Sequence, residues 1–332
     1  MKLGSFKYDG RTFVGTIFEP AQSEIGQAVV DLQAAFIAYL RERGESDPQA
    51  LGKAALPDDI LGFLRGGKRC LDCARIALGY VEESWHLDPD AFRQAASEGD
   101  RPIVHRRDSV RLMAPVPCPP KLICIGLNYR DHAREANSPI PKAPVLFSKF
   151  CNAIAGPNDP IIIPKVSSEI DYEAELAIVI GKQGKHISRD DALGYVAGYT
   201  ILNDVSARDL QMSEGQWLKG KTLDSFAPMG PFLITSDEIP NPGELDIKLW
   251  LNGALMQDSN TRELIFDVPA LIEYISNLMT LTPGDVIATG TPSGVGFTRK
   301  PPIFLKPGDT VSIEIERLGT LTNPVIAEEN DQ

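Results

Sequence analysis

The stretch Glu169-Ile-Asp-Tyr-Glu-Ala-Glu-Leu-Ala-Ile-Val-Ile-Gly181 begins with an acid at every second position and then becomes wholly apolar. Its β-branched Ile-Val-Ile run predicts a strand, and a strand sends alternate side chains to opposite faces. Glu173 and Glu175 are therefore expected to point the same way, and Glu169 and Asp171 extend the same alternation.

Carboxylates this close together repel one another unless a positive group lies among them. The repulsion is about 1 kcal/mol in bulk water and about 4 kcal/mol at an effective dielectric constant near 20. A hard divalent cation such as Mg²⁺ or Mn²⁺ suits carboxylate oxygens best. An isolated Glu-x-Glu is more often a solvated strand face, so the rest of the chain has to decide between the two interpretations.

Composition excludes several functional classes. The 332 residues allow one large domain or two modest ones, and 43% hydrophobic with 23% charged residues is typical of a globular protein. A net charge of −12 argues against nucleic-acid and anionic-membrane partners. No apolar run has the length of a membrane span, and residues 1–8 do not resemble a signal peptide, which predicts a cytoplasmic protein.

The five cysteines are an odd number in a long chain, which favours reduced thiols. Cys70 and Cys73 form a single CxxC in an expected helix. Because one such pair supplies only two metal ligands, we interpret both as ordinary, partly buried thiols.

Residues 1–112 are predicted to form a small α/β domain without concentrated chemistry. Aspartate-glycine marks a hairpin turn, apolar residues three or four apart predict helices, and Gly44 and Gly66-Gly67 interrupt them. The expected elements are strands 2–8 and 12–18 and helices 23–43, 58–64 and 70–81.

A proline-rich connector, residues 113–120, separates this domain from residues 121–332. Prolines at 115, 117, 119 and 120 make the connector stiff and extended, as at a domain boundary. Many short strands are expected beyond it, including 121–125, 145–148, 161–163, 286–289 and 309–316, with a hairpin over 245–257 and a helix from Pro269.

His132 and Glu135 are spaced three residues apart, so they share a face on a helical turn. A carboxylate beside an imidazole fixes its tautomer and raises its basicity, as a general base requires. A lone His–Glu pair is more often an ordinary surface pair. The proline-containing loop 136–144 that follows is expected to close over a ligand.

Two further segments are predicted to be loops. Lys219 and Lys221 lie among glycine, aspartate and proline residues, and Lys219 is expected to be solvated. The glycine-rich stretch 289–296 lacks the residue order of a phosphate loop, so we expect its backbone to line a binding site.

Together these segments resemble the fumarylacetoacetate hydrolase family, in particular its shorter acylpyruvase and oxaloacetate decarboxylase branch. The resemblance covers roughly residues 120–325, and the order of its segments is more specific than any one of them. The matching segments are Gly126-Leu-Asn-Tyr-x-x-His132-x-x-Glu135, Asp171-Tyr-Glu173-x-Glu175-Leu, Asn203-Asp204-Val-Ser-Ala-Arg208-Asp-x-Gln211, Lys221 with Ala227-Pro228-x-Gly, and Thr289-Gly-Thr291-Pro-x-Gly-Val-Gly.

The resemblance implies a role for each matching residue. Glu173, Glu175 and Asp204 are expected to ligate one Mg²⁺ or Mn²⁺, and no acid near Gly126 supplies the further ligand of parent fumarylacetoacetases. Three carboxylates leave about half of an octahedral shell for water and substrate. The residues implied to contact a 2-oxo acid are Arg208, Gln211, Lys221 and Thr291, and those implied to activate water are His132 and Glu135.

The resemblance also implies an α+β fold, with a mixed β-roll or barrel as catalytic domain, and a homodimer. The implied reaction is metal-dependent hydrolysis of the C–C bond of a 2,4-dioxo acid of acylpyruvate or fumarylpyruvate type, which releases pyruvate or a related 2-oxo acid. Lys221 and the metal would stabilise the enolate leaving group. Two alternatives stay open: oxaloacetate decarboxylation at the same site, and a non-catalytic member that binds 2-oxo acids.

Overall fold

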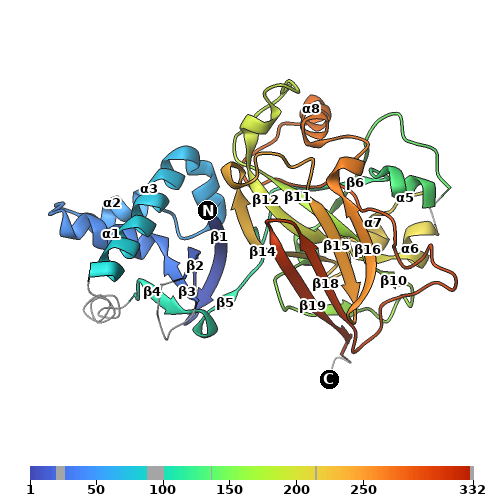
Figure 1. The fold of residues 1–332 in the computed structure, drawn as a ribbon, viewed down its shortest axis with the longest axis horizontal. Helices are drawn as coiled ribbons and strands as arrows, with labels where there is room; N and C mark the ends of the chain where they lie inside the picture. Colours follow the sequence, from blue (N-terminus) through green and yellow to red (C-terminus); the bar gives the residue numbers. More distant parts are fainter. Residues whose placement is uncertain (20–26, 88–100, 136, 214, 330–332) are drawn as a thin grey trace. The chain divides into compact units, whose positions relative to one another are not determined.

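A computed structural model describes residues 1–19, 27–87, 101–135, 137–213 and 215–329. The chain forms two compact units, Met1–Met113 and Ala114–Gln332 (Figure 1). Within the described ranges, no helix is long and apolar enough to cross a membrane.

The first unit contains an antiparallel sheet in the order β4-β3-β2-β1-β5. Its strands are β1 Lys2–Tyr8, β2 Arg11–Phe18, β3 Ala28–Asp31, β4 Val104–Arg106 and β5 Arg111–Leu112. The expected hairpin of β1 and β2 is confirmed, with Asp9 at φ 44° and Gly10 at φ 77°. Two successive left-handed residues match the twist of a hairpin.

The helices of this unit are α1 Leu32–Glu42, α2 Pro48–Ala55 and α3 Ile60–Leu87. The helix expected over 23–43 is wrong at its start, because residues 28–31 pair with β2 as a strand. The β-branched Val29 and Val30 favour this extended segment. Asp31 then caps α1 by accepting the N–H of Ala34, and residues 23–26 lie outside the described part. Gly67, at φ 56°, interrupts α3 as expected.

The main sheet of the second unit has the order β14-β12-β11-β17-β6-β7. Its strands are β14 Ala227–Thr235, β12 Val196–Asn203, β11 Ala174–Ile180, β17 Val286–Ala288, β6 Leu122–Gly126 and β7 Val145–Lys149, with β8 Ile154–Ala155 paired to β14. Every residue of β11 is buried, so the apolar half of the stretch 169–181 forms the centre of the core.

A second sheet has the order β16-β15-β18-β19-β9, and a two-stranded ribbon joins β10 to β13. These strands are β16 Ala254–Asn260, β15 Asp246–Leu251, β18 Thr310–Ile315, β19 Gly319–Ala327, β9 Ile161–Ile163, β10 Ile170–Asp171 and β13 Ser206–Ala207. Neither sheet closes on itself among the described residues, so the expected α+β fold is an open roll and not a barrel.

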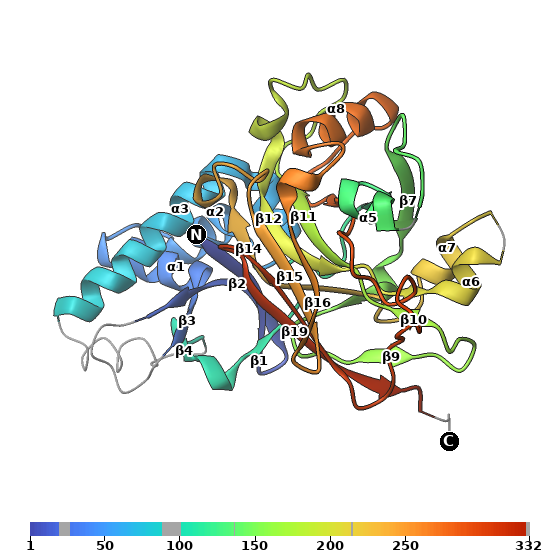
Figure 2. The same cartoon turned by 45° about the vertical axis from the view of Figure 1, so that its right-hand side comes forward.

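The helices of the second unit are α5 Arg130–Glu135, α6 Arg208–Met212, α7 Leu218–Lys221 and α8 Val268–Leu278. The loop expected around Lys219 and Lys221 is wrong, because both lie on α7, which packs beside α6 (Figure 2). A helical turn places them differently: Lys219 is exposed and Lys221 is buried.

The expectation of reduced cysteines is wrong for one pair. Cys118 of the connector and Cys151, just after β7, form a disulfide with their Cα atoms 5.2 Å apart. The chain path brings together two residues 33 positions apart, which no local pattern shows. Cys70, Cys73 and Cys124 are free thiols.

Candidate metal centre and substrate site

The pairing of β11 with β12 brings the acids of the site together. Ala174 lies opposite Asn203, so Glu173 and Asp204 each extend one residue beyond the same end of the ladder. The N–H of Asp204 donates to the carbonyl of Glu173 at 2.9 Å, and the Asn203 side chain accepts the N–H of Glu173 at 3.0 Å. The antiparallel register therefore joins two acids far apart in sequence.

Glu173, Glu175 and Asp204 are all buried, and one carboxylate oxygen from each lies within 4.8 Å of the others. The alternation of a strand explains why Glu173 and Glu175 face the same side. The interpretation of these acids as a solvated strand face is therefore excluded, and the three side chains expected to bind metal do converge.

Two lysines and Arg208 border this acidic group. Lys221 Nζ lies 2.7 Å from Glu173 Oε2 and 2.8 Å from Asp204 Oδ2. Lys149 Nζ contacts the other oxygen of Asp204 and donates to the carbonyl of Val205 at 2.9 Å. Glu173 and Asp204 thus each have a cation at hydrogen-bonding distance.

The two glutamates differ in their electrostatic surroundings. Burial alone would raise the pKa of Glu173, but Lys221 and Arg208 hold that pKa well below its ordinary value. The pKa of Glu175 is instead raised well above its ordinary value, first by burial and then by Asp204 and Glu173. Within the described residues, Glu175 accepts its hydrogen bond from a neutral donor, the N–H of Gly290 at 2.8 Å.

The donor set therefore fits a divalent cation. All three side chains offer hard oxygen atoms, which Mg²⁺ and Mn²⁺ prefer. A cation among them would stabilise the ionised form of Glu175, which its present neighbours oppose. The geometry suits a hard divalent metal.

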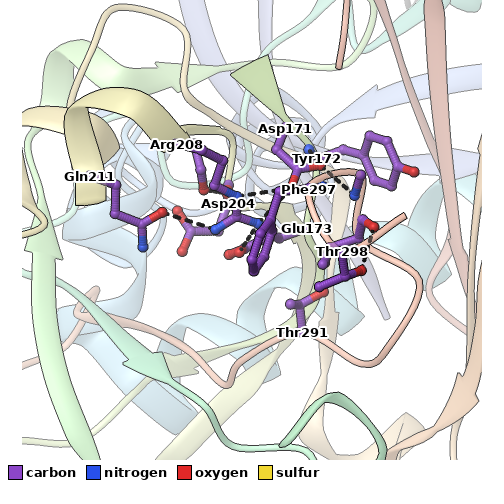
Figure 3. A network of polar contacts seen from close by, with 12 residues as sticks. Asp171, Tyr172, Glu173, Asp204, Arg208, Gln211, Thr291, Phe297 and Thr298 are labelled. Atoms are coloured by element: carbon purple, nitrogen blue, oxygen red, sulfur yellow. Dashed lines mark hydrogen bonds and ion pairs between the residues drawn. The ribbon is translucent and has the colours of Figure 1, made fainter. Parts of the chain in front are cut away.

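Arg208 lies beside the acids, at the start of α6 (Figure 3). Its Nε donates to Asp171 Oδ2 at 2.8 Å, one terminal nitrogen donates to Gln211 Oε1 at 2.9 Å, and the other donates to Glu173 Oε1 at 2.7 Å. The guanidinium also lies over the Phe297 ring, 4.3 Å from its centroid. Gln211 is brought to Arg208 as expected, and the fork of donors is fixed in one plane.

His132 and Glu135 share a turn of α5, as expected. His132 Nδ1 lies 3.6 Å from Glu135 Oε2, which is an ion-pair distance but longer than a hydrogen bond. Within the described residues, this buried nitrogen has no hydrogen-bond partner. Partial burial would raise the pKa of Glu135, but His132 and the N–H of Gly294 lower it. The two side chains therefore face each other across one helical turn, within ion-pair distance.

The N–H groups of the glycine-rich loop donate to carboxylates of the site. Gly290 donates to Glu175, and Gly294 donates to both oxygens of Glu135 at 3.1 and 3.0 Å. Gly296 donates to Asp171 at 2.7 Å. A Cβ at Gly294 would lie 2.1 Å from the carbonyl oxygen of Met256, so a side chain has no room there.

Thr291 lies in the same loop and is buried. Its hydroxyl accepts from Gln257 Nε2 at 2.8 Å, and Gln257 Oε1 accepts the N–H of Ala174 at 2.9 Å. Gln257, on β16, therefore ties the loop to the first residue of β11.

Three residues of the site were not assigned a role from the sequence: Lys149, Asp171 and Gln257. Asp171 lies in the stretch 169–181, and its spacing of two residues from Glu173 could have indicated that it belongs to the site. Lys149 ends an ordinary apolar strand and Gln257 lies in a hairpin, so only the tertiary structure brings them to the acids.

Strongly shifted acids beside fully buried cations are typical of an enzyme site. The family model described as "Fumarylacetoacetate (FAA) hydrolase C-terminal" matches residues 121–326. The chain belongs to the fumarylacetoacetate hydrolase family, which confirms the resemblance.

Its relatives include proteins named oxaloacetate tautomerase, mitochondrial. The one from Rattus norvegicus is 45% identical over 306 residues, which cover 92% of this chain and 86% of that protein. The one from Xenopus laevis is 54% identical over 222 residues, which cover 66% of this chain and 70% of that protein. These relatives are named as mitochondrial, whereas this chain is expected to be cytoplasmic. The cytoplasmic location of this chain stays a prediction.

Solved structures match the chain along almost its whole length. A fumarylacetoacetate hydrolase from Exiguobacterium antarcticum has a TM-score of 0.72 and 34% identity, and the match covers 99% of this chain and 100% of that chain. A putative HpcE protein from Mycobacterium smegmatis has a TM-score of 0.73 and 31% identity with the same coverage. The first unit therefore has a counterpart in these structures too.

Proposed function

We propose that this chain is a divalent-metal-dependent enzyme that interconverts the enol and keto forms of oxaloacetate. The observation that carries the proposal is the buried group of Glu173, Glu175 and Asp204, bordered by Arg208 and Lys221. The names of the relatives supply the substrate. They support oxaloacetate, the substrate of the decarboxylase alternative, more than the acylpyruvate substrate put first from the sequence.

In this proposal Arg208 and Gln211 bind the C1 carboxylate of the substrate. A planar guanidinium matches a carboxylate with two parallel donors, which a flexible ammonium does not. Arg208 is already oriented by three protein acceptors, so little conformational entropy is lost when the substrate binds. Thr291 lines the same site from the glycine-rich loop.

The reaction moves one proton. The enol loses the proton of its C2 hydroxyl and gains one at C3, so no water or carbon dioxide enters the balance. Lys221 would stabilise negative charge on the C2 oxygen, and His132, oriented by Glu135, would exchange the proton at C3. A divalent ion held by the three carboxylates would supply further positive charge next to the C1 carboxylate and the C2 oxygen.

Two other reactions would instead form the enolate of pyruvate, which the same positive groups could stabilise. Decarboxylation of oxaloacetate would need no base at C3 to start, whereas hydrolysis of an acylpyruvate would need a water activated by His132. The His132–Glu135 pair suits proton transfer and water activation equally, so product analysis has to separate the reactions.

The test follows enol-oxaloacetate by its ultraviolet absorbance with Mg²⁺, with Mn²⁺ and with EDTA. Pyruvate release from oxaloacetate and from acetylpyruvate is measured in parallel. We expect metal-dependent loss of the enol that is faster than pyruvate release from either compound, and EDTA should return the rate to that of buffer.

Each other result assigns a different reaction. Pyruvate release from oxaloacetate at the rate of enol loss would indicate a decarboxylase. Faster turnover of acetylpyruvate would restore the hydrolase interpretation. Stoichiometric metal binding without turnover of any of the three would indicate a binding protein, and would refute the proposed activity.

A further inference from the structure

We infer that Asp171 is a positioning residue for substrate binding, which fixes both Arg208 and the glycine-rich loop without binding the metal. This inference rests on the proposed function, in which Arg208 binds the substrate carboxylate. Asp171 shares the alternation of the two metal-binding glutamates, but the structure gives it other partners.

The Asp171 side chain is 0% exposed, and both of its oxygens have two donors. Oδ1 accepts the N–H of Tyr172 at 2.8 Å and that of Gly296 at 2.7 Å. Oδ2 accepts Arg208 Nε at 2.8 Å and the N–H of Phe297 at 3.1 Å. A carboxylate with four such donors has little capacity left for a cation, and Asp171 is not in the group of acids whose oxygens converge.

The contact to Nε determines how the guanidinium is turned. Because the group is planar, fixing Nε on Asp171 directs the other two nitrogens toward Glu173 and Gln211 (Figure 3). The ring of Phe297 covers the face of the guanidinium, and the N–H of Phe297 is held by the same Asp171. The Asp171 carboxylate therefore fixes both the Arg208 guanidinium and the Phe297 ring that covers it.

The contact to Gly296 extends this control to the proton-transfer pair. Gly294, two residues earlier in the loop, donates its N–H to Glu135. A Cβ at Gly296 would lie 1.9 Å from the Ile303 carbonyl oxygen and 2.6 Å from Asp171 Oδ1, so the loop and the carboxylate are in close contact. Asp171 thus links the position of Arg208 to that of Glu135.

The substitution Asp171→Asn tests this role. The amide places an NH₂ group opposite an N–H donor, and the negative charge facing Arg208 is lost. Binding of oxalate, a chelating dianion, is measured by calorimetry at saturating Mg²⁺, and Mg²⁺ binding is measured separately. A charge-assisted hydrogen bond is worth about 1.5–3 kcal/mol, so oxalate affinity should fall roughly 10- to 100-fold. Mg²⁺ affinity should not change, and the KM for enol-oxaloacetate should rise more than kcat falls.

Asp285→Asn is the matched control. Asp285 is also 0% exposed, and its side chain pairs with Lys121 at 2.7 Å and accepts the N–H of Thr282 at 2.7 Å, neither of which belongs to the site. We expect a lower melting temperature with unchanged oxalate affinity. Equal losses of oxalate affinity in both variants would mean general loosening of the fold, and would overturn the inference.

Arg208→Lys completes a double-mutant cycle, because lysine has no Nε to bind Asp171. If Asp171 acts through Arg208, its substitution should have little further effect in this background. Should the Asn variant not fold, Asp171→Ser keeps one acceptor and leaves room for water. Wild-type oxalate affinity in Asp171→Asn, or in the Ser variant that replaces it, overturns the positioning role. Failure of the wild type to bind oxalate with Mg²⁺ would instead refute the proposed function.

Discussion

Arg101 in the first unit and Arg208 in the second have closely similar partners. Arg101 donates to Asp31 from Nε at 2.6 Å and to Gln33 Oε1 from a terminal nitrogen at 2.6 Å. Arg208 donates in the same way to Asp171 at 2.8 Å and to Gln211 Oε1 at 2.9 Å. Each arginine therefore joins a buried aspartate to a glutamine.

The difference lies in what surrounds each group. Asp31 also caps α1. The second acid near Arg101, Asp58, is 46% exposed, so water screens its charge. Around Arg208 the acids are buried, and the pKa of Glu175 is raised first by burial and then by Asp204 and Glu173. An arginine, an aspartate and a glutamine do not by themselves make a functional site. Three buried carboxylates that converge, with one oxygen of each within 4.8 Å of the others, do indicate one.

The largest expected effect tests the second group. Glu173→Gln removes a charge that faces Lys221 and Arg208 and that belongs to the proposed metal site. Loss of one preorganised electrostatic partner typically costs about 10²–10³-fold in rate, so turnover should fall at least that far and Mg²⁺ affinity should weaken. Turnover of enol-oxaloacetate and calorimetry with Mg²⁺ are the measurements.

Unchanged activity together with unchanged Mg²⁺ affinity in this variant would mean that the buried acids beside Arg208 are not a functional site. Circular dichroism of the variant shows whether a loss reflects the site or the fold.

An intermediate effect is expected in the first group. Asp31→Asn keeps an acceptor for the cap of α1 but removes the charge that faces Arg101. The free energy of unfolding should fall by about 1–3 kcal/mol, the cost of losing a hydrogen bond to a charged group. Urea unfolding measures the change, and kcat/KM should stay at the wild-type value. A loss of activity as large as that of Glu173→Gln would contradict a purely structural role.

The smallest expected effect is a pH dependence in the first unit. His105 is buried between Tyr8 and Phe13, and burial lowers its pKa from the ordinary 6.5. Between the lowered value and 6.5 the unfolded chain binds more protons than the folded one. The contribution of His105 to the free energy of unfolding is therefore complete above pH 6.5 and declines as the pH falls through this range.

Urea midpoints across that range measure the slope, and His105→Gln should flatten it. An unchanged slope in the variant would assign the pH dependence to other groups.

Local signals accounted for much of the fold and of the site. The alternating acids before a β-branched run correctly indicated one face for Glu173 and Glu175, and the spacing of His132 and Glu135 indicated a shared helical turn. Turn chemistry identified the hairpin at Asp9, because left-handed residues there are a local requirement. Where short-range geometry decides, the sequence was sufficient.

Long-range packing decided the rest. Val29 fits both a helical pattern and a strand, and its pairing with β4 settled the choice. Lys149 and Gln257 carry no motif, yet strand order places one against Asp204 and the other against the glycine-rich loop. The disulfide of Cys118 and Cys151 likewise follows from the chain path alone.

The glycine-rich loop holds its carboxylates through main-chain groups, and substitution of a side chain does not delete a main-chain N–H unless proline is introduced. Phe297 illustrates the consequence, because its backbone holds Asp171 while its ring covers Arg208. The ring over Arg208 can therefore be altered at position 297 while the main-chain contact to Asp171 persists. Under the proposed function, position 297 is therefore where substitutions could change the acid substrate, by engineering or by evolution, without loss of the contact to Asp171.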